Sequence, residues 1–309
     1  MRASVVIPTK NRRNDLRRAI SSAIRQTERV EVIVIDDGSN DGTSEMVKEE
    51  FPQVRLDRTD VSLGQAVQRN RGTLLSSREF VFSIDDDAEF STPRVVEQTL
   101  AEFSHPRIAA IAIPYVEAQE PCRKHQVAPD REDIWATDIF RGTAYALKRD
   151  IFLGLGGYLE QTVFQGEEMD YCIRLLNSGY IVRLGSSDII IHDESPKRDW
   201  RRQDFYGRWN DILFAWRNVP MPYMPVHLIA TTLNGVKHAA AARSASDIRG
   251  ILFGYSGILL NWGARKPVSR DAYRLHRLLK KRGPRNLIEI ENLLPPVLER
   301  SRSNTSELK

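Results

Sequence analysis

The stretch Phe80-Val81-Phe82-Ser83-Ile84-Asp85-Asp86-Asp87 decides the fold, because an apolar run ends directly in three carboxylates. The run predicts a buried β-strand, and ligands bind at the C-terminal edge of such strands in open α/β sheets. Since side chains alternate along a strand, Asp85 and Asp87 are expected on one side and Asp86 on the other. Two neighbouring carboxylates repel each other unless a cation lies between them, and a divalent cation that also holds a phosphate fits this need. An acidic turn that caps the next helix would use the same residues.

Short apolar runs alternate with helical patterns on both sides of this stretch. Further strands are expected at 5–7, 32–35, 54–56 and 108–113, with helices between them. This alternation predicts an α/β fold with a mostly parallel sheet and helices on both faces. The polar stretch 114–140 is predicted to be a long irregular excursion.

The sequence changes in character after about residue 200, where helical patterns run to about residue 298. We expect an α/β domain at 1–198, a mainly helical C-terminal subdomain at 199–300 and a frayed polar tail at 301–309. The longest uncharged stretches there are interrupted by prolines or fall short of the ~20 residues that cross a bilayer. No spanning helix is predicted, and peripheral membrane contact and a homodimer stay open.

Composition narrows the class of protein. The 309 residues are 41% hydrophobic and 28% charged, which indicates a globular chain. The net charge of +4 is mild and does not indicate a nucleic-acid partner. Cys122 and Cys172 are too few for a disulfide framework or a zinc site. No apolar signal segment precedes the strand at 5–7, so a cytoplasmic location is the default expectation.

A second polar group, Asp36-Asp37-Gly38-Ser39-Asn40-Asp41-Gly42-Thr43, follows the strand at 32–35. Acids at a strand end can accept hydrogen bonds from a base or a ribose. The same residues also suit a tight turn that starts a helix.

Two more acidic groups follow later in the chain. Glu167, Glu168 and Asp170 crowd the start of a helix, where the macrodipole alone favours acids. One of them is a candidate general base, and Asp170 can pair with Arg174 one turn on. His192 ends an apolar run and is expected at the same sheet edge as the first acids, which favours a ligand role.

Together these segments resemble the family 2 glycosyltransferases, which have the nucleotide-sugar-binding GT-A fold. The resemblance covers about residues 4–195. Six segments match the family in order, namely Val5 to Arg12, Asp36 to Thr43, the helix Gly64 to Gly72 with its Arg69-Asn70-Arg71-Gly72 end, Asp85 to Asp87, Gly156-Gly157-Tyr158 and Glu167 to Asp170. The third acidic group departs from the family, because Glu168 stands where an aspartate base is usual.

The resemblance implies a role for each matching position. The implied nucleotide-binding residues are Pro8, Thr9, Asn11, Arg12, Asp36, Asp37, Arg69, Asp85 and Asp86. Asp85, Asp87 and His192 would hold Mg²⁺ or Mn²⁺, which binds the diphosphate. Glu168 would be the catalytic base, with Glu167 and Asp170 left open because of the departure from aspartate.

The expected function is therefore metal-dependent, inverting transfer of a hexosyl or deoxyhexosyl group from a nucleoside-diphosphate sugar. The acceptor would be a hydroxyl of a sugar, a glycolipid or another small molecule. The reaction would belong to cell-surface polysaccharide or glycoconjugate synthesis. Any membrane contact would be at the inner face of the plasma membrane. A sugar-phosphate nucleotidyltransferase would normally show a glycine-rich basic loop, and 8–14 is not glycine-rich. A non-catalytic nucleotide-sugar-binding protein would be expected to lose Glu168 or Asp87. Both alternatives stay open.

Overall fold

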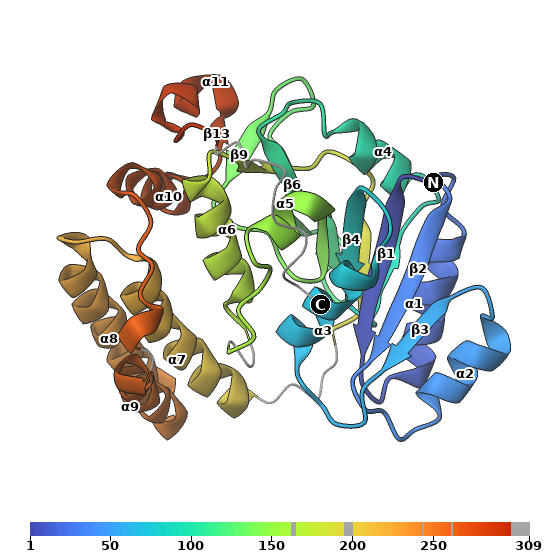
Figure 1. Cartoon of the computed structure of the whole chain (residues 1–309), viewed down its shortest axis with the longest axis horizontal. Coiled ribbons are helices and arrows are strands. Elements are labelled where there is room, and N and C mark those ends of the chain that lie inside the picture. Colours follow the sequence, from blue (N-terminus) through green and yellow to red (C-terminus); the bar gives the residue numbers. More distant parts are fainter. Residues whose placement is uncertain (162–164, 195–199, 243, 261, 298–309) are drawn as a thin grey trace.

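A computed structural model describes residues 1–161, 165–194, 200–242, 244–260 and 262–297. Within these ranges a nine-stranded sheet runs in the order β13-β9-β11-β6-β10-β4-β1-β2-β3 (Figure 1). Its strands are β1 (Ala3–Thr9), β2 (Val30–Asp36), β3 (Arg55–Arg58), β4 (Phe80–Ile84), β6 (Ile108–Ala112), β9 (Trp135–Thr137), β10 (Ala144–Lys148), β11 (Ile181–Leu184) and β13 (Arg285–Asn286). The strand that ends in the three aspartates lies between β1 and β10, near the middle of the sheet.

Helices cover both faces of this sheet, as the sequence predicts. One face carries α1 (Arg13–Ile24), α2 (Thr43–Glu50) and α4 (Val95–Ala101), and the other carries α3 (Gln65–Leu75), α5 (Arg149–Gly154) and α6 (Glu167–Asn177). Strand alternation supplies both cores, since Val5 and Ile7 pack on the first face and Val6 packs on the second. The α/β expectation is confirmed.

The sheet is mixed, so the prediction of a mostly parallel sheet is only half right. Strands β3, β2, β1 and β4 are parallel to one another, but β10 is antiparallel to both β4 and β6. β9 is likewise antiparallel to β11. The chain reaches β10 from β6 without a helix, and antiparallel strands do not need the long crossover that parallel strands require.

The segment 114–140 is not irregular throughout, which corrects the sequence prediction. It holds β7 (Tyr115–Glu117), β8 (Lys124–His125) and β9. With β5 (Ala88–Phe90) and β12 (Ile190–His192), the first two of these form a second sheet in the order β5-β12-β7-β8. Strands of two or three residues are too short to show an alternating pattern, so they could not be predicted from the sequence.

The C-terminal helices are present as predicted. The helices α7 (Trp200–Asn218), α8 (Tyr223–Ala242) and α9 (Ala245–Leu260) form a lobe beside α6 (Figure 1). The chain then returns to the main sheet through α10 (Arg270–Arg282), β13 and α11 (Leu287–Ile290), whose Leu279 and Leu287 join its core. In the described part of the chain, no helix combines the length and the apolar character that crossing a bilayer would require.

We predict that acid destabilises the fold through His276 of α10. This side chain is 1% exposed, and its burial lowers its pKa from 6.5 to about 3. Above pH 6.5 the imidazole is neutral in both states, whereas below it the unfolded chain gains a proton that the folded chain excludes. The residue should therefore remove about 2 kcal/mol from the free energy of unfolding by pH 5. Urea unfolding at pH 7.5 and pH 5 measures this loss. It should shrink in His276→Leu, and an unchanged pH dependence in that variant would contradict the assignment.

Candidate active site

A cleft of about 1350 Å³ lies at the C-terminal ends of β1 and β4. The start of α6, parts of the segment 115–143 and one side of α7 complete its walls. Most of the residues singled out from the sequence line this cleft, namely Pro8, Thr9, Arg12, Asp37, Arg69, Asp85, Asp86, Asp87, Glu168 and His192. The expected site residues therefore meet in one place, with two exceptions, Asn11 and Asp36.

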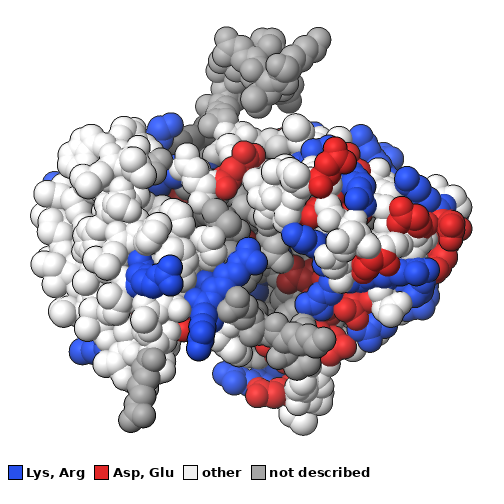
Figure 2. Space-filling view, turned by 90° about the horizontal axis from the view of Figure 1, so that it is seen from below, with Lys and Arg blue, Asp and Glu red and all other residues white. Residues whose placement is uncertain are grey.

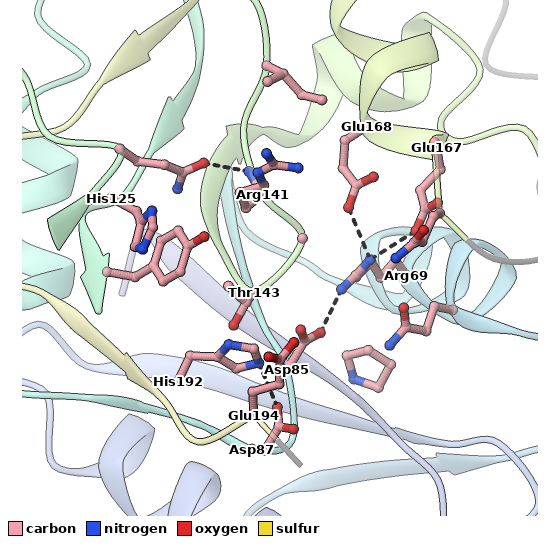
Figure 3. Close-up of a pocket in the computed structure, with 18 of the residues that line it drawn as sticks. Arg69, Asp85, Asp87, His125, Arg141, Thr143, Glu167, Glu168, His192 and Glu194 are labelled. Carbon is pink, nitrogen blue, oxygen red and sulfur yellow. Dashed lines mark hydrogen bonds and ion pairs between the residues drawn. The ribbon is translucent and has the colours of Figure 1, made fainter. Parts of the chain in front are cut away.

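Asp85, Asp87 and His192 form the candidate metal-binding group. One potential ligand atom from each side chain lies within 4.8 Å of the other two. His192 Nε2 is 3.3 Å from Asp87 Oδ1 (Figure 3). The histidine was expected at the edge of the main sheet, but it lies on β12 of the second sheet. β12 pairs with β5, the strand that directly follows the aspartates in the chain. This pairing brings the imidazole to Asp87.

Glu117 completes this group and was not expected from the sequence. Its Oε2 lies 2.8 Å from His192 Nδ1, and the two residues are neighbours on the paired strands β7 and β12. A carboxylate on one ring nitrogen fixes the tautomer and leaves the other nitrogen, here Nε2, for a ligand. Burial alone would lower the pKa of His192, but the neighbouring carboxylates, chiefly Asp87, raise it to about 9.

The acids outnumber the cations near this group. Burial and the charge of Asp87 raise the pKa of Asp86 to about 7, although Thr9 donates a 2.7 Å hydrogen bond to it. Arg12 supplies one compensating charge, with Nη1 3.1 Å from Asp87. Carboxylate oxygens suit Mg²⁺ and Mn²⁺, and an imidazole is a ligand for transition metals. The donor set of two carboxylates and one imidazole therefore fits Mn²⁺ better than Mg²⁺.

Arg69 joins the metal-binding group to the start of α6. Its guanidinium lies 2.6 Å from Asp85, 3.2 Å from Glu167 and 3.8 Å from Glu168 (Figure 3). The side chain is 2% exposed, and these carboxylates raise its pKa above the ordinary value although burial opposes the rise. Arg69 also lines the cleft, so its expected contact with the nucleotide stays a prediction. Its ion pairs suit a role in which Arg69 holds the carboxylates of both groups in position.

The residues after Arg69 explain how α3 holds it there. Asn70 donates a 2.8 Å hydrogen bond to the Tyr158 carbonyl and accepts another from the Tyr158 amide, so it fixes the turn at Gly157. A Cβ at Gly72 would lie 2.3 Å from Val6 Cγ1, so α3 approaches β1 this closely only with glycine there. The Arg-Asn-x-Gly sequence thus packs the helix against both the sheet and the turn.

Glu167 and Glu168 of α6 both line the cleft, and Glu168 is the more exposed of the two. Its side chain is 16% exposed against 2% for Glu167. Burial raises the pKa of Glu168, while Arg69 opposes the rise. Burial and the charge of Glu168 raise the pKa of Glu167 to about 8. A Cβ at Gly142 would lie 2.6 Å from Glu168 Oε1, so this glycine leaves the space that the carboxylate occupies.

Asp170 has a structural role on the same helix. Arg174 lies 2.7 Å from its carboxylate, which confirms the pair expected from the sequence. Asn218 of α7 donates a further 2.8 Å hydrogen bond to it. Both carboxylate oxygens are therefore engaged by protein groups.

The acids after β2 divide into one that lines the cleft and one that does not. Asp37 accepts hydrogen bonds from Ser62 Oγ and the Leu63 amide at 2.6 and 2.7 Å, which lower its pKa although burial would raise it. Asp36 is fully buried and accepts from the Ser39 amide at 2.8 Å. Successive residues of a strand point to opposite sides, so Asp36 faces the interior and is not available to a nucleotide.

Asn11 also lies outside the cleft lining. Its side-chain oxygen accepts a 2.8 Å hydrogen bond from the Asn40 amide, and its own amide donates to Ser39 Oγ. The residue therefore ties the loop after β1 to the turn after β2.

Basic side chains of the segment 115–143 line the cleft and were not expected either, namely Arg123, Lys124, His125 and Arg141. The imidazole of His125 stacks on Tyr115 at 4.8 Å between ring centroids. The sequence offered only their charge as a signal, because Lys124 and His125 lie on a two-residue strand and Arg123 and Arg141 lie outside any strand.

Comparison with known proteins agrees with this geometry. Residues 4–155 match the family described as glycosyl transferase family 2. The chain is 28% identical over 225 residues to the pre-mycofactocin glycosyltransferase of Mycobacterium tuberculosis, which covers 66% of this chain and 46% of that protein. It is 39% identical over 92 residues to the poly(ribitol-phosphate) beta-N-acetylglucosaminyltransferase TarP of Staphylococcus aureus, 28% of each chain. The chain thus spans half or less of the length of these relatives.

Solved structures share the fold. The mannosyltransferase PcManGT of Pyrobaculum calidifontis, in complex with GDP-Man and Mn²⁺, superimposes with a TM-score of 0.56 at 20% identity, over 89% of this chain and 78% of that chain. TarS of S. aureus superimposes with a TM-score of 0.55 at 14% identity, over 81% and 54%. The fold is that of the GT-A glycosyltransferases. Residues 4–155, just under half of the chain, match glycosyltransferase family 2.

We predict that Glu117 supports metal binding through His192. Replacing Glu117 by Gln weakens the interaction with His192 Nδ1. The loss of such a partner typically lowers metal affinity by about 10–100-fold. Calorimetric titration with Mn²⁺ measures the change. Glu120→Gln is a matched control, because Glu120 is exposed and pairs only at 3.6 Å with Arg123. Equal Mn²⁺ affinity in Glu117→Gln and the wild type would contradict the role of Glu117.

Proposed function

We propose that the chain is a metal-dependent, inverting glycosyltransferase that moves a sugar from a nucleoside-diphosphate sugar to an acceptor hydroxyl. One observation carries this proposal. A single cleft holds the group Asp85, Asp87 and His192 together with Glu168, and Arg69 lies between them. A donor diphosphate and an acceptor hydroxyl can therefore be bound within one cleft.

The donor side of the cleft is built for a metal and a diphosphate. Asp85, Asp87 and His192 would hold Mn²⁺ or Mg²⁺, which when bound offsets the negative charge of the leaving diphosphate. Pro8, Thr9, Arg12 and Asp37 line the adjoining part of the cleft and are the proposed nucleotide contacts. The basic side chains at 123–125 and 141 add positive charge to the same cleft, which suits a leaving diphosphate.

Glu168 is the proposed general base. Its carboxylate would accept the proton of the acceptor hydroxyl while the hydroxyl oxygen forms a bond to the anomeric carbon. The bond between that carbon and the diphosphate oxygen breaks, and the diphosphate leaves with the electron pair. One displacement of this kind inverts the anomeric centre and needs no protein nucleophile. Arg69 would hold Glu168 at a fixed place relative to Asp85.

The sugar is proposed to be a hexose or a deoxyhexose in cell-surface polysaccharide or glycoconjugate synthesis. Relatives support this class, since one is named a poly(ribitol-phosphate) beta-N-acetylglucosaminyltransferase and another, of Rhizobium meliloti, a succinoglycan biosynthesis protein. A panel of UDP-, GDP- and dTDP-sugars, read by release of the nucleoside diphosphate, tests the donor. Absence of release from every donor, with pyrophosphate formed from a nucleotide and a sugar phosphate, would overturn the proposal.

We predict that Asp87→Ala abolishes the Mn²⁺-dependent part of donor binding, because it removes one of three ligands. Thermal stabilisation by each donor, with and without Mn²⁺, measures this. Asp57→Ala is the control, since Asp57 of β3 pairs with Arg71 of α3 and does not line the cleft. Donor binding with unchanged metal dependence in Asp87→Ala would show that Asp87 is not a ligand.

We predict that Glu168→Gln lowers turnover by roughly 10²–10⁴-fold, the usual scale for the loss of a general base. The substitution keeps the shape of the side chain and removes its basicity, so donor affinity should change little. Single-turnover assays and donor titration separate the two effects. Glu167→Gln is the comparison variant on the same helix, because Glu167 contacts the same arginine and is the other candidate base. Near-wild-type turnover in Glu168→Gln, with a large loss in Glu167→Gln, would transfer the role to Glu167.

A further inference from the structure

The helices α8 and α9 present large apolar side chains to the outside of the molecule. Eight of these side chains, each 44% to 85% exposed, make up what we call the hairpin face, namely Val226, Ile229, Leu233, Val236, Leu252, Phe253, Leu259 and Leu260. Figure 2 shows a broad uncharged region on the side of the molecule where these helices lie, with Lys and Arg along its border. Apolar surface on this scale marks an interaction site in a folded protein.

The inner side of the same helices carries glycines beside the buried Ile251 and Ile258 of α9. A Cβ at Gly250 would lie 2.3 Å from the Phe205 carbonyl oxygen, and a Cβ at Gly254 would lie 2.7 Å from Ile212 Cβ. Gly235 of α8 approaches Ile251 of α9 in the same way. A surface helix in water turns its large apolar residues inward. Here the glycines face inward and Leu252 and Leu259 face outward, an arrangement that suits helices packed together against lipid.

The charges around the hairpin face have one sign. The sequence from Ile212 to Arg270 holds seven Lys and Arg residues and a single acid, Asp247. That acid is fully buried and lies 2.9 Å from Arg208 Nε, so it adds no negative charge to the surface. Lys237, Arg249 and Lys266 are exposed. A basic, apolar surface complements anionic headgroups and repels a second copy of itself.

An aromatic and basic group lies at the end of α9. Trp262 is 63% exposed and its ring lies 4.5 Å from that of Trp216. The Arg265 guanidinium lies over Trp216 at 5.0 Å from the ring centroid. Tryptophan beside basic side chains is typical of the boundary between headgroups and acyl chains.

We propose that the α8–α9 hairpin docks on an anionic phospholipid bilayer. The hairpin face would enter the boundary between headgroups and acyl chains without crossing the bilayer, and the basic side chains would contact the phosphates. α7 packs between this hairpin and the cleft, and its Asn210 and Asp211 line the cleft. Docking would therefore hold the cleft next to the membrane surface. This binding needs neither donor nor metal, so it is measured apart from sugar transfer.

Sedimentation with vesicles tests the proposal. The protein should sediment with vesicles of phosphatidylcholine and phosphatidylglycerol at low salt, bind less as salt rises, and bind vesicles of phosphatidylcholine alone more weakly. The double substitution Leu252→Asp and Leu259→Asp should lower the partition coefficient by about tenfold or more, since it removes two apolar side chains from the inserted face. Leu74→Asp is the control, because Leu74 is 59% exposed on α3, outside the hairpin. Circular dichroism checks that each variant is folded.

Quenching of tryptophan fluorescence by brominated lipids locates the contact. The quenching should fall in Trp262→Phe, because Trp262 is expected at the bilayer boundary. Absence of sedimentation with phosphatidylglycerol vesicles at low salt would overturn the proposal, as would sedimentation that the double substitution leaves unchanged. A dimer that the double substitution dissociates, with no vesicle binding, would instead assign the hairpin face to a second copy of the chain.

Discussion

The site depends on one buried cation, Arg69, held among Asp85, Glu167 and Glu168. A guanidinium is charged at any working pH, so its burial requires carboxylates, and those carboxylates require it in turn. Removing the arginine would leave three acids in a poorly solvated place, where burial already raises the pKa of Glu167 to about 8. The same ion pairs fix the distance between strand β4 and helix α6. The two halves of the proposed chemistry are thereby held in one geometry.

The second sheet positions His192 next to Asp87, as Arg69 positions the acids of α6. β5 follows the aspartates directly, and β12 pairs with it, so the imidazole comes to Asp87 through backbone pairing. β7 pairs on the other side of β12 and brings Glu117 to the second ring nitrogen. Three strands of three residues each thus assemble a charge arrangement in which acids exceed cations. Such an arrangement favours a bound divalent cation over solvent.

The C-terminal helices belong to the site as well as to the outer surface. α7 contributes Asn210 and Asp211 to the cleft, and on its other side it receives the glycines of α9. The close approach that glycine permits makes α7 and α9 a rigid pair, so the position of the hairpin face relative to the cleft is set by packing. α10 and β13 then tie this lobe back to the main sheet, because Leu279 is buried in the central core and Arg285 pairs with Ala136.

The sequence by itself determined the elements with a clear period and the groups that follow them. The apolar runs before Asp36 and Asp85 are long enough to show as strands, and acids at such strand ends meet at one sheet edge, so most of the cleft residues could be predicted. It also determined the Asp170–Arg174 pair, because residues four apart on a helix are neighbours whatever surrounds them. Only the tertiary structure decided the rest. Glu117, Lys124 and His125 lie on strands too short to show a pattern. Asp36 faces inward while Asp37 lines the cleft. The burial of Arg69 among carboxylates depends on Glu167 and Glu168, which lie almost 100 residues away in the chain. Sequence spacing does not record such distances, because they exist only once the sheet, α3 and α6 have packed together.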